Sequence, residues 1–254
     1  MQKFQLLLRC LKLWARKRGI HCHLVGFFAG IHLAVLGAYV CRRHPNATAN
    51  TLLLMPCYPP EFCASNVTKS TFNKIKEELW RGLSLTKDTS SVDVDWNWIF
   101  APFPYAAKYK HFLRIVLSAP TTEELRDWVG WVKSRFRSLI LKLESLNIGC
   151  DPNPLEQVDH SIGEPNAVFL WGLIMYSNTQ ICTTSLKKDF MRSVTNNIYG
   201  KEKCAHSDIE LSVVGMPQVP KSMSDQSAYL QKLPNLPPRM LGYPPMRQGC
   251  NAVG

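Results

Sequence analysis

The sequence lacks the features that define several common protein classes. None of its nine cysteines belongs to a Cys-x-x-Cys pair, so the paired ligands typical of a closed zinc site are missing. Its first twenty residues interleave charges with apolar residues and offer no clean apolar stretch, which is unlike a signal peptide. We therefore expect free thiols in a reducing compartment and no metal site built from cysteine.

Acidic residues are missing from the first fifth of the chain. Residues 1–50 contain no aspartate or glutamate, although the 254-residue chain has 19 acidic and 30 basic residues and a formal net charge of +11. The basic residues of this segment are Lys3, Arg9, Lys12, Arg16, Lys17, Arg18, Arg42 and Arg43. An excess of positive charge predicts an anionic partner, either a nucleic acid or a membrane surface.

Long apolar runs are also scarce, and the one candidate lies at residues 24–41. This stretch has the minimum length for a membrane span, but His32 lies near its centre and basic clusters flank both ends. We interpret it as a buried helix of a globular domain. The alternative, a peripheral or spanning membrane protein that uses residues 1–43, is the weaker hypothesis.

What is present is enough apolar material for a packed core. Hydrophobic residues make up 46% of the chain, which excludes a chain disordered throughout. Helical spacing predicts an amphipathic basic helix ending near Gly19, a second helix over 29–43 and a third over 70–85. One face of the third helix carries Phe72, Ile75, Leu79 and Leu83.

The second half of the chain changes to a mixture of strands and helices. Strands are expected at 112–117, 167–176 and 209–214. A long helix should begin after Thr121, with Glu124 completing a capping box, and a further helix is expected over 185–198. The pattern predicts an α+β fold, with an all-α first domain followed by a ferredoxin-like, RNA-recognition-type sandwich.

Several motifs resemble those of eukaryotic nuclear poly(A) polymerases, and plant members most. Residues 9–19 (RCLKLWARKRG), 25–30 (VGFFAG), 44–47 (HPNA) and 66–71 (NVTKST) are similar to the central domain of that family. Residues 100–104 (FAPFP) and 128–135 (WVGWVKSR) resemble its C-terminal RNA-binding domain. The resemblance implies a central domain at 1–88, an RNA-binding domain at 96–219 and a Pro-rich, disordered tail at 220–254.

The family transfers AMP from ATP to an RNA 3′ hydroxyl and uses two divalent metal ions, Mg²⁺ or Mn²⁺. In the family, the carboxylates for such two-metal chemistry follow a Gly-Ser turn in an N-terminal palm domain. This sequence contains no Gly-Ser dipeptide, and its one Asp-x-Asp, formed by Asp93 and Asp95, lies in a polar linker. We therefore expect no catalytic residue and no metal ligand in this chain, and no adenylyl transfer by the chain alone.

The resemblance does assign residues to the nucleotide. The family's contacts to ATP fall on Lys12, His21, Gly30 and Ile31 of this chain. Lys12 offers an ammonium group to a triphosphate, and Gly30 permits a close approach of the ligand to the backbone. His21 stands where the family has a tyrosine, and Ile31 where it has a valine.

A second departure from the family lies between Leu53 and Leu54. A segment of a few dozen residues, rich in aromatic residues, is missing there by comparison with the family. An incomplete gene model and an exon-skipped form both explain that gap.

Candidate contacts to RNA are less specific. The basic residues Lys133, Arg135 and Arg137 of the long helix would bind phosphate without sequence preference, unless they only solvate the helix surface. Phe169, Trp171 and Tyr176 lie on a predicted strand, where RNA-recognition folds stack bases. Aromatic residues on a lone strand are more often part of a core.

The expected function is thus that of a poly(A) polymerase family protein acting in mRNA polyadenylation in the nucleus. The alternative is a non-catalytic RNA-binding or scaffold protein of the 3′-end processing machinery. RNA is the expected partner, with 3′-end processing factors as further partners and no membrane.

Overall fold

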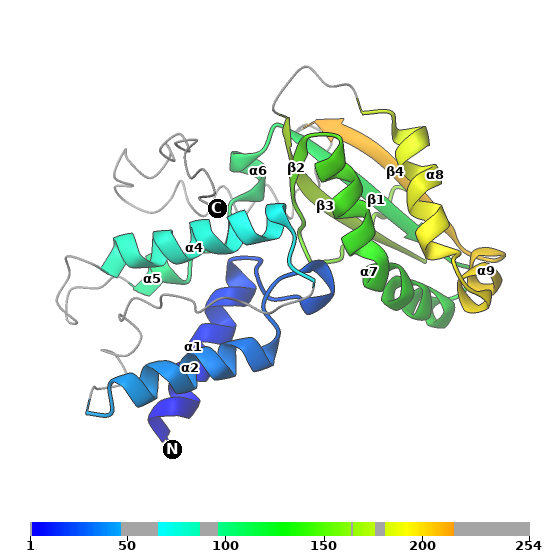
Figure 1. The fold of residues 1–254 in the computed structure, drawn as a ribbon. Helices are drawn as coiled ribbons and strands as arrows, with labels where there is room; N and C mark the ends of the chain where they lie inside the picture. Colours follow the sequence, from blue (N-terminus) through cyan, green and yellow to red (C-terminus); the bar gives the residue numbers. More distant parts are fainter. Residues whose placement is uncertain (1, 47–65, 87–95, 164, 176–180, 216–254) are drawn as a thin grey trace, which may run out of the picture.

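A computed structural model describes residues 2–46, 66–86, 96–163, 165–175 and 181–215 (Figure 1). The expectations for the 53–54 gap, for Asp93 and Asp95, for Tyr176 and for the 220–254 tail lie outside these residues. Within the described residues, none of the helices combines the length and apolarity needed to cross a bilayer.

The described part of the first domain is helical. Its elements are α1 (Gln2–Lys17), the short 3₁₀ helix η1 (His23–Val25), α2 (Gly30–Arg43) and α4 (Lys69–Thr86). α1 and α2 pack against each other, with Phe4, Leu7 and Leu11 of α1 lying close to Gly37 of α2. Two short helices, α5 (Trp96–Ile99) and α6 (Tyr105–Lys108), lead into the second domain.

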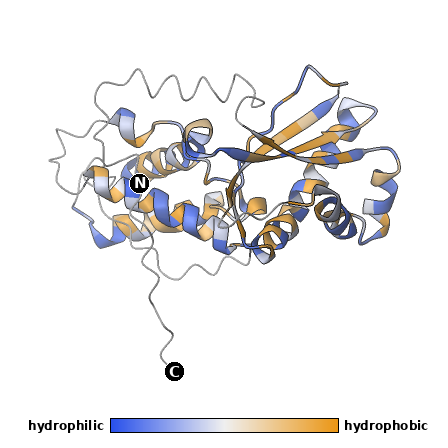
Figure 2. Ribbon diagram, turned by 90° about the horizontal axis from the view of Figure 1, so that it is seen from above, coloured by the Kyte–Doolittle hydropathy of each residue, from blue (hydrophilic) through white to orange (hydrophobic). Residues whose placement is uncertain are grey.

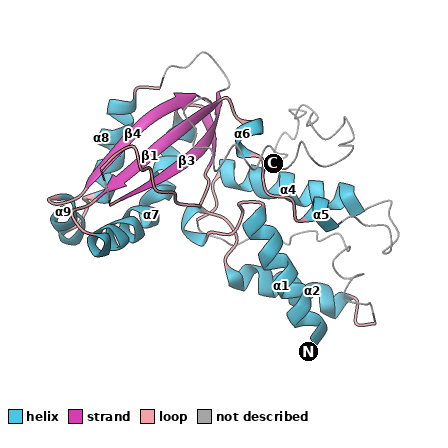
Figure 3. Ribbon diagram, turned by 180° about the vertical axis from the view of Figure 1, so that it is seen from behind, coloured by secondary structure: helices cyan, strands magenta, loops and turns pink. Residues whose placement is uncertain are grey.

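The second domain is a four-stranded antiparallel sheet with helices on one face. Its elements in chain order are β1 (His111–Ser118), α7 (Thr122–Ser145), β2 (Ile148–Asp151), β3 (Asn166–Met175), α8 (Thr183–Val194), α9 (Ile198–Cys204) and β4 (Asp208–Gly215). The strand order is β2-β3-β1-β4, and β1 pairs with both β3 and β4 over its full length. This βαββαβ arrangement confirms the predicted α+β, ferredoxin-like sandwich. Figure 3, seen from behind, shows the strands in front of α7 and α8.

The main core lies between the sheet and α7. The eight residues that give α7 its apolar stripe are all buried, and they are Leu125, Trp128, Val129, Val132, Phe136, Leu139, Ile140 and Leu143. Phe136 contacts the rings of both Phe169 and Trp171 on β3. Figure 2 shows the strands largely in hydrophobic colours and the helices with one hydrophobic and one hydrophilic side. The same core continues into the first domain through Trp14, Ile20 and Phe27.

The outer face of the sheet is covered in part by the segment that precedes β1. Phe103, Tyr105 and Tyr109 form a second apolar cluster with Phe112, Val116, Val168 and Leu170. Gly172 of β3 permits this packing, because a Cβ atom there would collide with the ring of Tyr109. Both faces of β3 are therefore buried over residues 166–173.

Three expectations from the sequence need correction. The helix expected over 185–198 ends at Val194, and α9 begins at Ile198, so one predicted helix is two. The sequence pattern does not predict strand β2, because Ile148–Asp151 is short and precedes a proline. The expected apolar face of the 70–85 helix is only partly buried: Ile75 is buried and Leu79 packs against the core, but Phe72 is 49% exposed. The polar residues Thr71, Lys74 and Glu78 are buried beside Ile75.

Candidate nucleotide site and the junction between the domains

Lys12 lies on α1 beside the start of α2. α1 is amphipathic, and its buried residues Leu7, Trp14 and Ala15 fix its orientation against the rest of the domain. Lys12 is half-buried on a neighbouring face. A Cβ atom built on Gly30 would lie 3.7 Å from Lys12 Cε and 3.9 Å from Lys12 Nζ, so the ammonium group lies close to the first residue of α2.

The first turn of α2 has the geometry of an anion site. The first N–H groups of a helix have no partner within it and carry the positive end of its dipole. Gly30 begins α2, and just before it the backbone N–H of Ala29 donates to Nδ1 of His32 at 3.1 Å. Ala29 and Gly30, the two residues at the start of this turn, have no side chain larger than a methyl group. The ammonium of Lys12 and the helix N-terminus together attract a negatively charged group.

His21 lies near enough to Lys12 for the lysine charge to affect its pKa. Burial lowers the pKa of His21, and the positive charges of Arg16 and Lys12 lower it further. Its Nε2 atom is buried and has no hydrogen-bond partner among the described residues. A neutral imidazole with an unpaired nitrogen can donate to, or accept from, a ligand placed beside Lys12.

Ile31 is the fourth residue that the resemblance assigns to the nucleotide. It follows Gly30 in the first turn of α2, and its side chain is 65% exposed. The structure therefore brings Lys12 and Gly30 together, places His21 within range of the Lys12 charge and leaves Ile31 exposed at the same helix end. These residues suit the phosphates of a nucleotide and an apolar contact to it.

Metal ions are a separate question. No group of three or more His, Cys, Asp or Glu side chains with the geometry of a metal site occurs in the ranges that the structure describes. The described residues thus do not fit the two-metal centre that the family uses.

A cluster of buried charges joins the two domains. Lys74 of α4 pairs with Asp151 of β2 at 2.5 Å, and both side chains are only 3% exposed. The Tyr109 hydroxyl donates to the same carboxylate oxygen at 2.5 Å, and Lys74 Nζ lies 2.7 Å from the centroid of the Phe103 ring. Burial lowers the pKa of Lys74 to about 8, although the carboxylates of Asp151 and Glu78 act to raise it. A buried pair of this kind constrains how the domains fit together.

A second buried pair ties the end of α1 to α4. Arg18 makes a bidentate contact with Glu78, with Nε–Oε2 at 2.6 Å and Nη2–Oε1 at 3.0 Å. Its Nη1 also donates to the backbone carbonyls of Ala101 and Pro102 at 2.8 and 3.0 Å. Burial acts to raise the pKa of Glu78, but the charge and hydrogen bonds of Arg18 outweigh it and hold that pKa below its usual value. Arg18 therefore links α1, α4 and the segment leading into the second domain.

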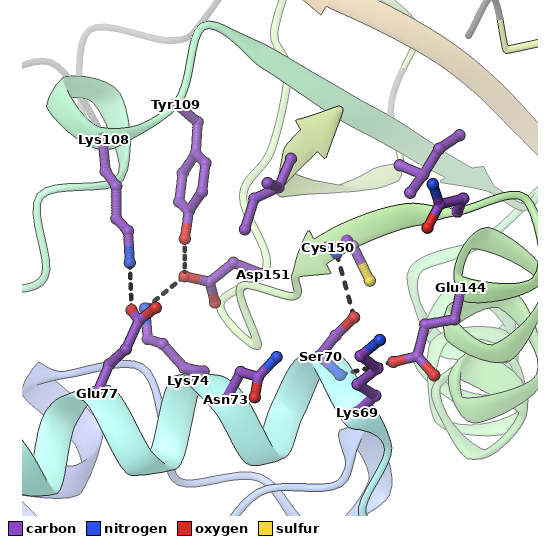
Figure 4. A pocket seen from close by; sticks show the side chains of 14 residues that line it. Lys69, Ser70, Asn73, Lys74, Glu77, Lys108, Tyr109, Glu144, Cys150 and Asp151 are labelled. Carbon is purple, nitrogen blue, oxygen red and sulfur yellow. Dashed lines mark hydrogen bonds and ion pairs between the residues drawn. The ribbon is translucent and has the colours of Figure 1, made fainter. Parts of the chain in front are cut away.

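A small cavity lies at this junction, between α4 and the edge of the sheet (Figure 4). Its volume of about 60 Å³ leaves room for water molecules but not for a nucleotide, which needs several hundred Å³. Cys150 lines it, and burial raises the pKa of that thiol far above its usual value, so it is no nucleophile. The Tyr109 pKa is likewise raised by burial and by Asp151. The cavity belongs to the structural junction and has no catalytic constellation.

The basic residues proposed for RNA do not share one face of α7. At about 100° per residue, Arg135 points nearly opposite to Lys133 and Arg137. Lys133 lies 3.6 Å from Glu156 and near the Phe169 ring, while the guanidinium of Arg135 stacks on the Trp131 ring at 4.2 Å. Arg137 is half-buried. Their role toward RNA stays a prediction.

The aromatic residues of β3 are part of the core. Phe169 and Trp171 are fully buried beneath α7 and are not available for stacking with a base in this arrangement. The opposite face of β3 is covered by the cluster around Tyr109. The described part of the sheet thus offers no open aromatic platform of the kind that RNA-recognition folds use.

The residues that sequence reasoning missed are those of the junction. Lys74 and Glu78 lie one turn apart on α4, where a charged residue ordinarily indicates a solvated face. The signal that could have exposed them is their spacing from Thr71 and Ile75, with which they form a continuous face. Their partners, Arg18 and Asp151, are distant in the sequence and give no local signal.

Comparison with known proteins bears on both domains. The family model described as the poly(A) polymerase central domain matches residues 3–55, and the one described as the poly(A) polymerase predicted RNA binding domain matches residues 104–148. The chain is 38% identical over 257 residues to nuclear poly(A) polymerase 3 of Arabidopsis thaliana, which covers 87% of the chain and 50% of that relative.

Other relatives carry related names. Nuclear poly(A) polymerases 1 and 4 of the same plant are 30% and 28% identical and cover 63% and 68% of the chain. The chain spans about half the length of the first relative and less than a third of these two.

Proposed function

The chain belongs to the poly(A) polymerase family, and we propose that it provides the nucleotide-phosphate site and the RNA-binding domain for the addition of AMP to mRNA 3′ ends. The observation that carries this proposal is the proximity of Lys12 to the N-terminus of α2, with His21 within range of the Lys12 charge, on the domain whose family model matches. RNA is the proposed partner, because the second domain matches the family's RNA-binding domain.

The role of each residue follows from its chemistry. Lys12 would neutralise the charge of the nucleotide phosphates, and the free N–H groups of the first turn of α2 would donate to their oxygens. His21 would hydrogen-bond to the ligand through Nε2, in place of the family's tyrosine. Ile31 would contact the nucleotide through its exposed side chain.

The 254 residues by themselves should not transfer AMP. Two-metal displacement needs carboxylates that hold both ions, and neither a Gly-Ser turn nor an Asp-x-Asp motif outside the 93–95 linker is found in the sequence. Incubation of the purified chain with ATP, Mg²⁺ or Mn²⁺ and an oligo(A) primer should therefore give no extended product. Extension that depends on the protein and survives purification to homogeneity would show this expectation to be wrong.

A non-catalytic RNA-binding or scaffold role is the second candidate, and the net charge of +11 favours it. Binding through lysine and arginine releases counterions, so the affinity for RNA should fall steeply as salt rises. Filter binding of single-stranded RNA over a salt series tests this, and an absence of binding at low salt would remove this candidate.

We place the protein in the nucleus, together with 3′-end processing factors. The support is that its relatives are named nuclear poly(A) polymerases. Microscopy of a fluorescent fusion tests this placement, and a signal confined to the cytoplasm would contradict it.

A further inference from the structure

α4 carries an unusual exposed face. Four of its exposed residues, Lys69, Phe72, Lys76 and Trp80, follow one another at intervals of three or four and so lie on one side of the helix. Phe72 is 49% exposed and Trp80 is 54% exposed. We call this side, formed by Lys69, Phe72, Lys76 and Trp80, the aromatic–basic stripe.

Phe72, Lys76 and Trp80 point away from the body of the protein, while Lys69, at the start of the helix, lies at the edge of the junction cavity (Figure 4). The buried residues of α4, Thr71, Ile75 and Glu78 among them, face the rest of the structure. At about 100° per residue, the centre of the stripe lies roughly 160° around the helix from the centre of that buried face. Neither ring packs in the core, so the stability of the fold does not explain two large aromatic side chains here.

The charges on the stripe all have one sign. Lys69 and Lys76 are exposed, and neither has an ion-pair partner in the part of the chain that the structure describes. The nearest acidic residue on α4, Glu77, is on the flank of the helix and is paired with Lys108 at 2.6 Å. A surface of alternating lysine and aromatic side chains complements a polyanion that also presents flat, stackable groups.

We propose that the aromatic–basic stripe of α4 binds single-stranded RNA, with bases stacked on Phe72 and Trp80 and phosphates contacted by Lys69 and Lys76. Aromatic stacking and lysine contacts to the backbone are the two components of single-strand binding. The rings lie eight residues apart, about 12 Å along the helix axis. That distance corresponds to roughly three to four stacked nucleotides at about 3.4 Å each.

The stripe is separate from the residues already assigned to nucleotide and RNA. It lies on the first domain, whereas Lys133, Arg135 and Arg137 lie on α7 of the second, and it includes none of the residues around Lys12. The inference rests on the proposed function only in taking RNA as a partner. It adds a binding surface that the covered sheet of the second domain does not supply.

The test compares variants of the 254-residue chain by fluorescence anisotropy with a fluorescein-labelled oligo(A) of fifteen nucleotides at low salt. The double variant Phe72→Ala/Trp80→Ala should bind at least about 30-fold more weakly, since it removes two stacked bases at about 1–3 kcal/mol each. The matched control is Tyr39→Ala, which removes another aromatic side chain that is 49% exposed, on α2. That control should bind within about two-fold of the unmodified chain.

The charges are tested separately. Lys69→Gln/Lys76→Gln should lower the slope of log affinity against log salt by about 1.4, because each lost phosphate contact on a single strand removes about 0.7. Arg42→Gln/Arg43→Gln removes the same net charge from exposed positions on α2 and should change the slope less. All variants alter exposed side chains, so their thermal midpoints should match that of the unmodified chain, and circular dichroism checks this.

The outcomes separate this inference from the proposed function. If the chain binds oligo(A) and the Phe72→Ala/Trp80→Ala variant binds equally well, the stripe is not an RNA surface while the RNA-binding function stands. If the unmodified chain binds no oligo(A) at low salt, both proposals fail. If the aromatic variant instead abolishes self-association seen by sedimentation and leaves RNA affinity unchanged, the stripe is a protein contact and the inference is overturned.

Discussion

The Nε2 atom of His21 is buried, and in the described ranges no donor or acceptor contacts it. Lys12 and Arg16 lie close enough for their charges to lower the pKa of this histidine. An unpaired polar atom costs free energy in the absence of a ligand, which is a common property of binding sites. At the scale of single residues, therefore, the unpaired Nε2 atom of His21 supports the role proposed for it.

This tuning has a consequence for pH. The folded protein binds a proton at His21 more weakly than the unfolded chain, whose histidine has a pKa of about 6.5. The unfolded state therefore takes up more protons as the pH falls below about 6.5, and the stability of the fold decreases there. We expect the thermal midpoint to fall more steeply between pH 7.5 and 5.5 in the unmodified chain than in His21→Gln.

Thermal denaturation at several pH values makes this comparison. The other histidines are common to both proteins, so their contributions cancel in the difference. Equal slopes for the two proteins would show that His21 is not the strained group described above.

At the scale of elements, the covering of the sheet restricts which surfaces could bind the proposed RNA. The cluster around Phe103 and Tyr109 lies on the outer face of β1 and β3. This packing depends on Gly172, which leaves the ring of Tyr109 room to lie against the strand. The second domain has the topology of an RNA-recognition fold with its outer face at least partly covered by its own chain.

Alanine substitutions at two glycines test this packing. Gly172→Ala should destabilise the protein by about 1–3 kcal/mol, because the added methyl group would overlap the Tyr109 ring. Gly130→Ala is the matched control, since Gly130 is exposed within α7 and a Cβ atom there meets nothing within 4 Å. It should be neutral or stabilise by up to about 1 kcal/mol through helix propensity. Urea denaturation measures both, and a neutral Gly172→Ala would contradict the described packing.

The elements with a strong local pattern were predictable from the sequence. The apolar residues of α7 and its capping residue Thr121 predict this helix from the sequence alone. In the structure, the Thr121 hydroxyl accepts a hydrogen bond from the N–H of Glu124 at 3.2 Å. The buried face of α4 was only partly predictable. Its apolar spacing identifies Ile75 and Leu79, but the buried Lys74 and Glu78 pair with Asp151 of β2 and with Arg18 at the end of α1, and these partners are distant in the sequence. Strand β2 was too short to give a pattern of its own.

The candidate site was predictable only through the resemblance. From helical spacing alone, Lys12 would be interpreted as a solvated charge on the helix surface. No local feature of the sequence connects it with Gly30. Tertiary packing of α1 against α2 brings the two together. The junction pairs escaped prediction for the same reason, because Arg18 and Glu78 are 60 residues apart.

At the scale of the whole molecule, buried ion pairs connect the domains. Arg18 and Glu78 link α1 to α4, and Lys74 and Asp151 link α4 to the sheet. The main apolar core also runs through both domains. We therefore expect the two domains to unfold together rather than one after the other.

Removing one member of a buried pair should be costly. Lys74→Met leaves the Asp151 carboxylate buried without its cation, and we expect a loss of about 3–5 kcal/mol. Lys74→Met/Asp151→Asn removes both charges and keeps an acceptor for the Tyr109 hydroxyl, so it should recover most of that loss. Calorimetry of the two variants checks this, and equal destabilisation of both would contradict a role for the charge pair.

The fold shows where part of the positive charge of the chain lies. The segment without acidic residues forms α1 and α2, which supply Lys12 and the helix terminus of the candidate site. The charge that predicted an anionic partner thus lies partly at the site that we propose for phosphate.

The most direct test of that site is a titration of the isotopically labelled chain with ATP, followed through backbone amide resonances. The amides of Gly30, Ile31 and His32 should shift progressively at millimolar ATP, because their N–H groups would donate to phosphate oxygens. Lys12→Gln should weaken this binding several-fold, whereas Lys17→Gln, which removes an exposed charge from the same helix, should leave it nearly unchanged. Unmoved resonances at the start of α2, or equal binding by Lys12→Gln and the unmodified chain, would contradict the account.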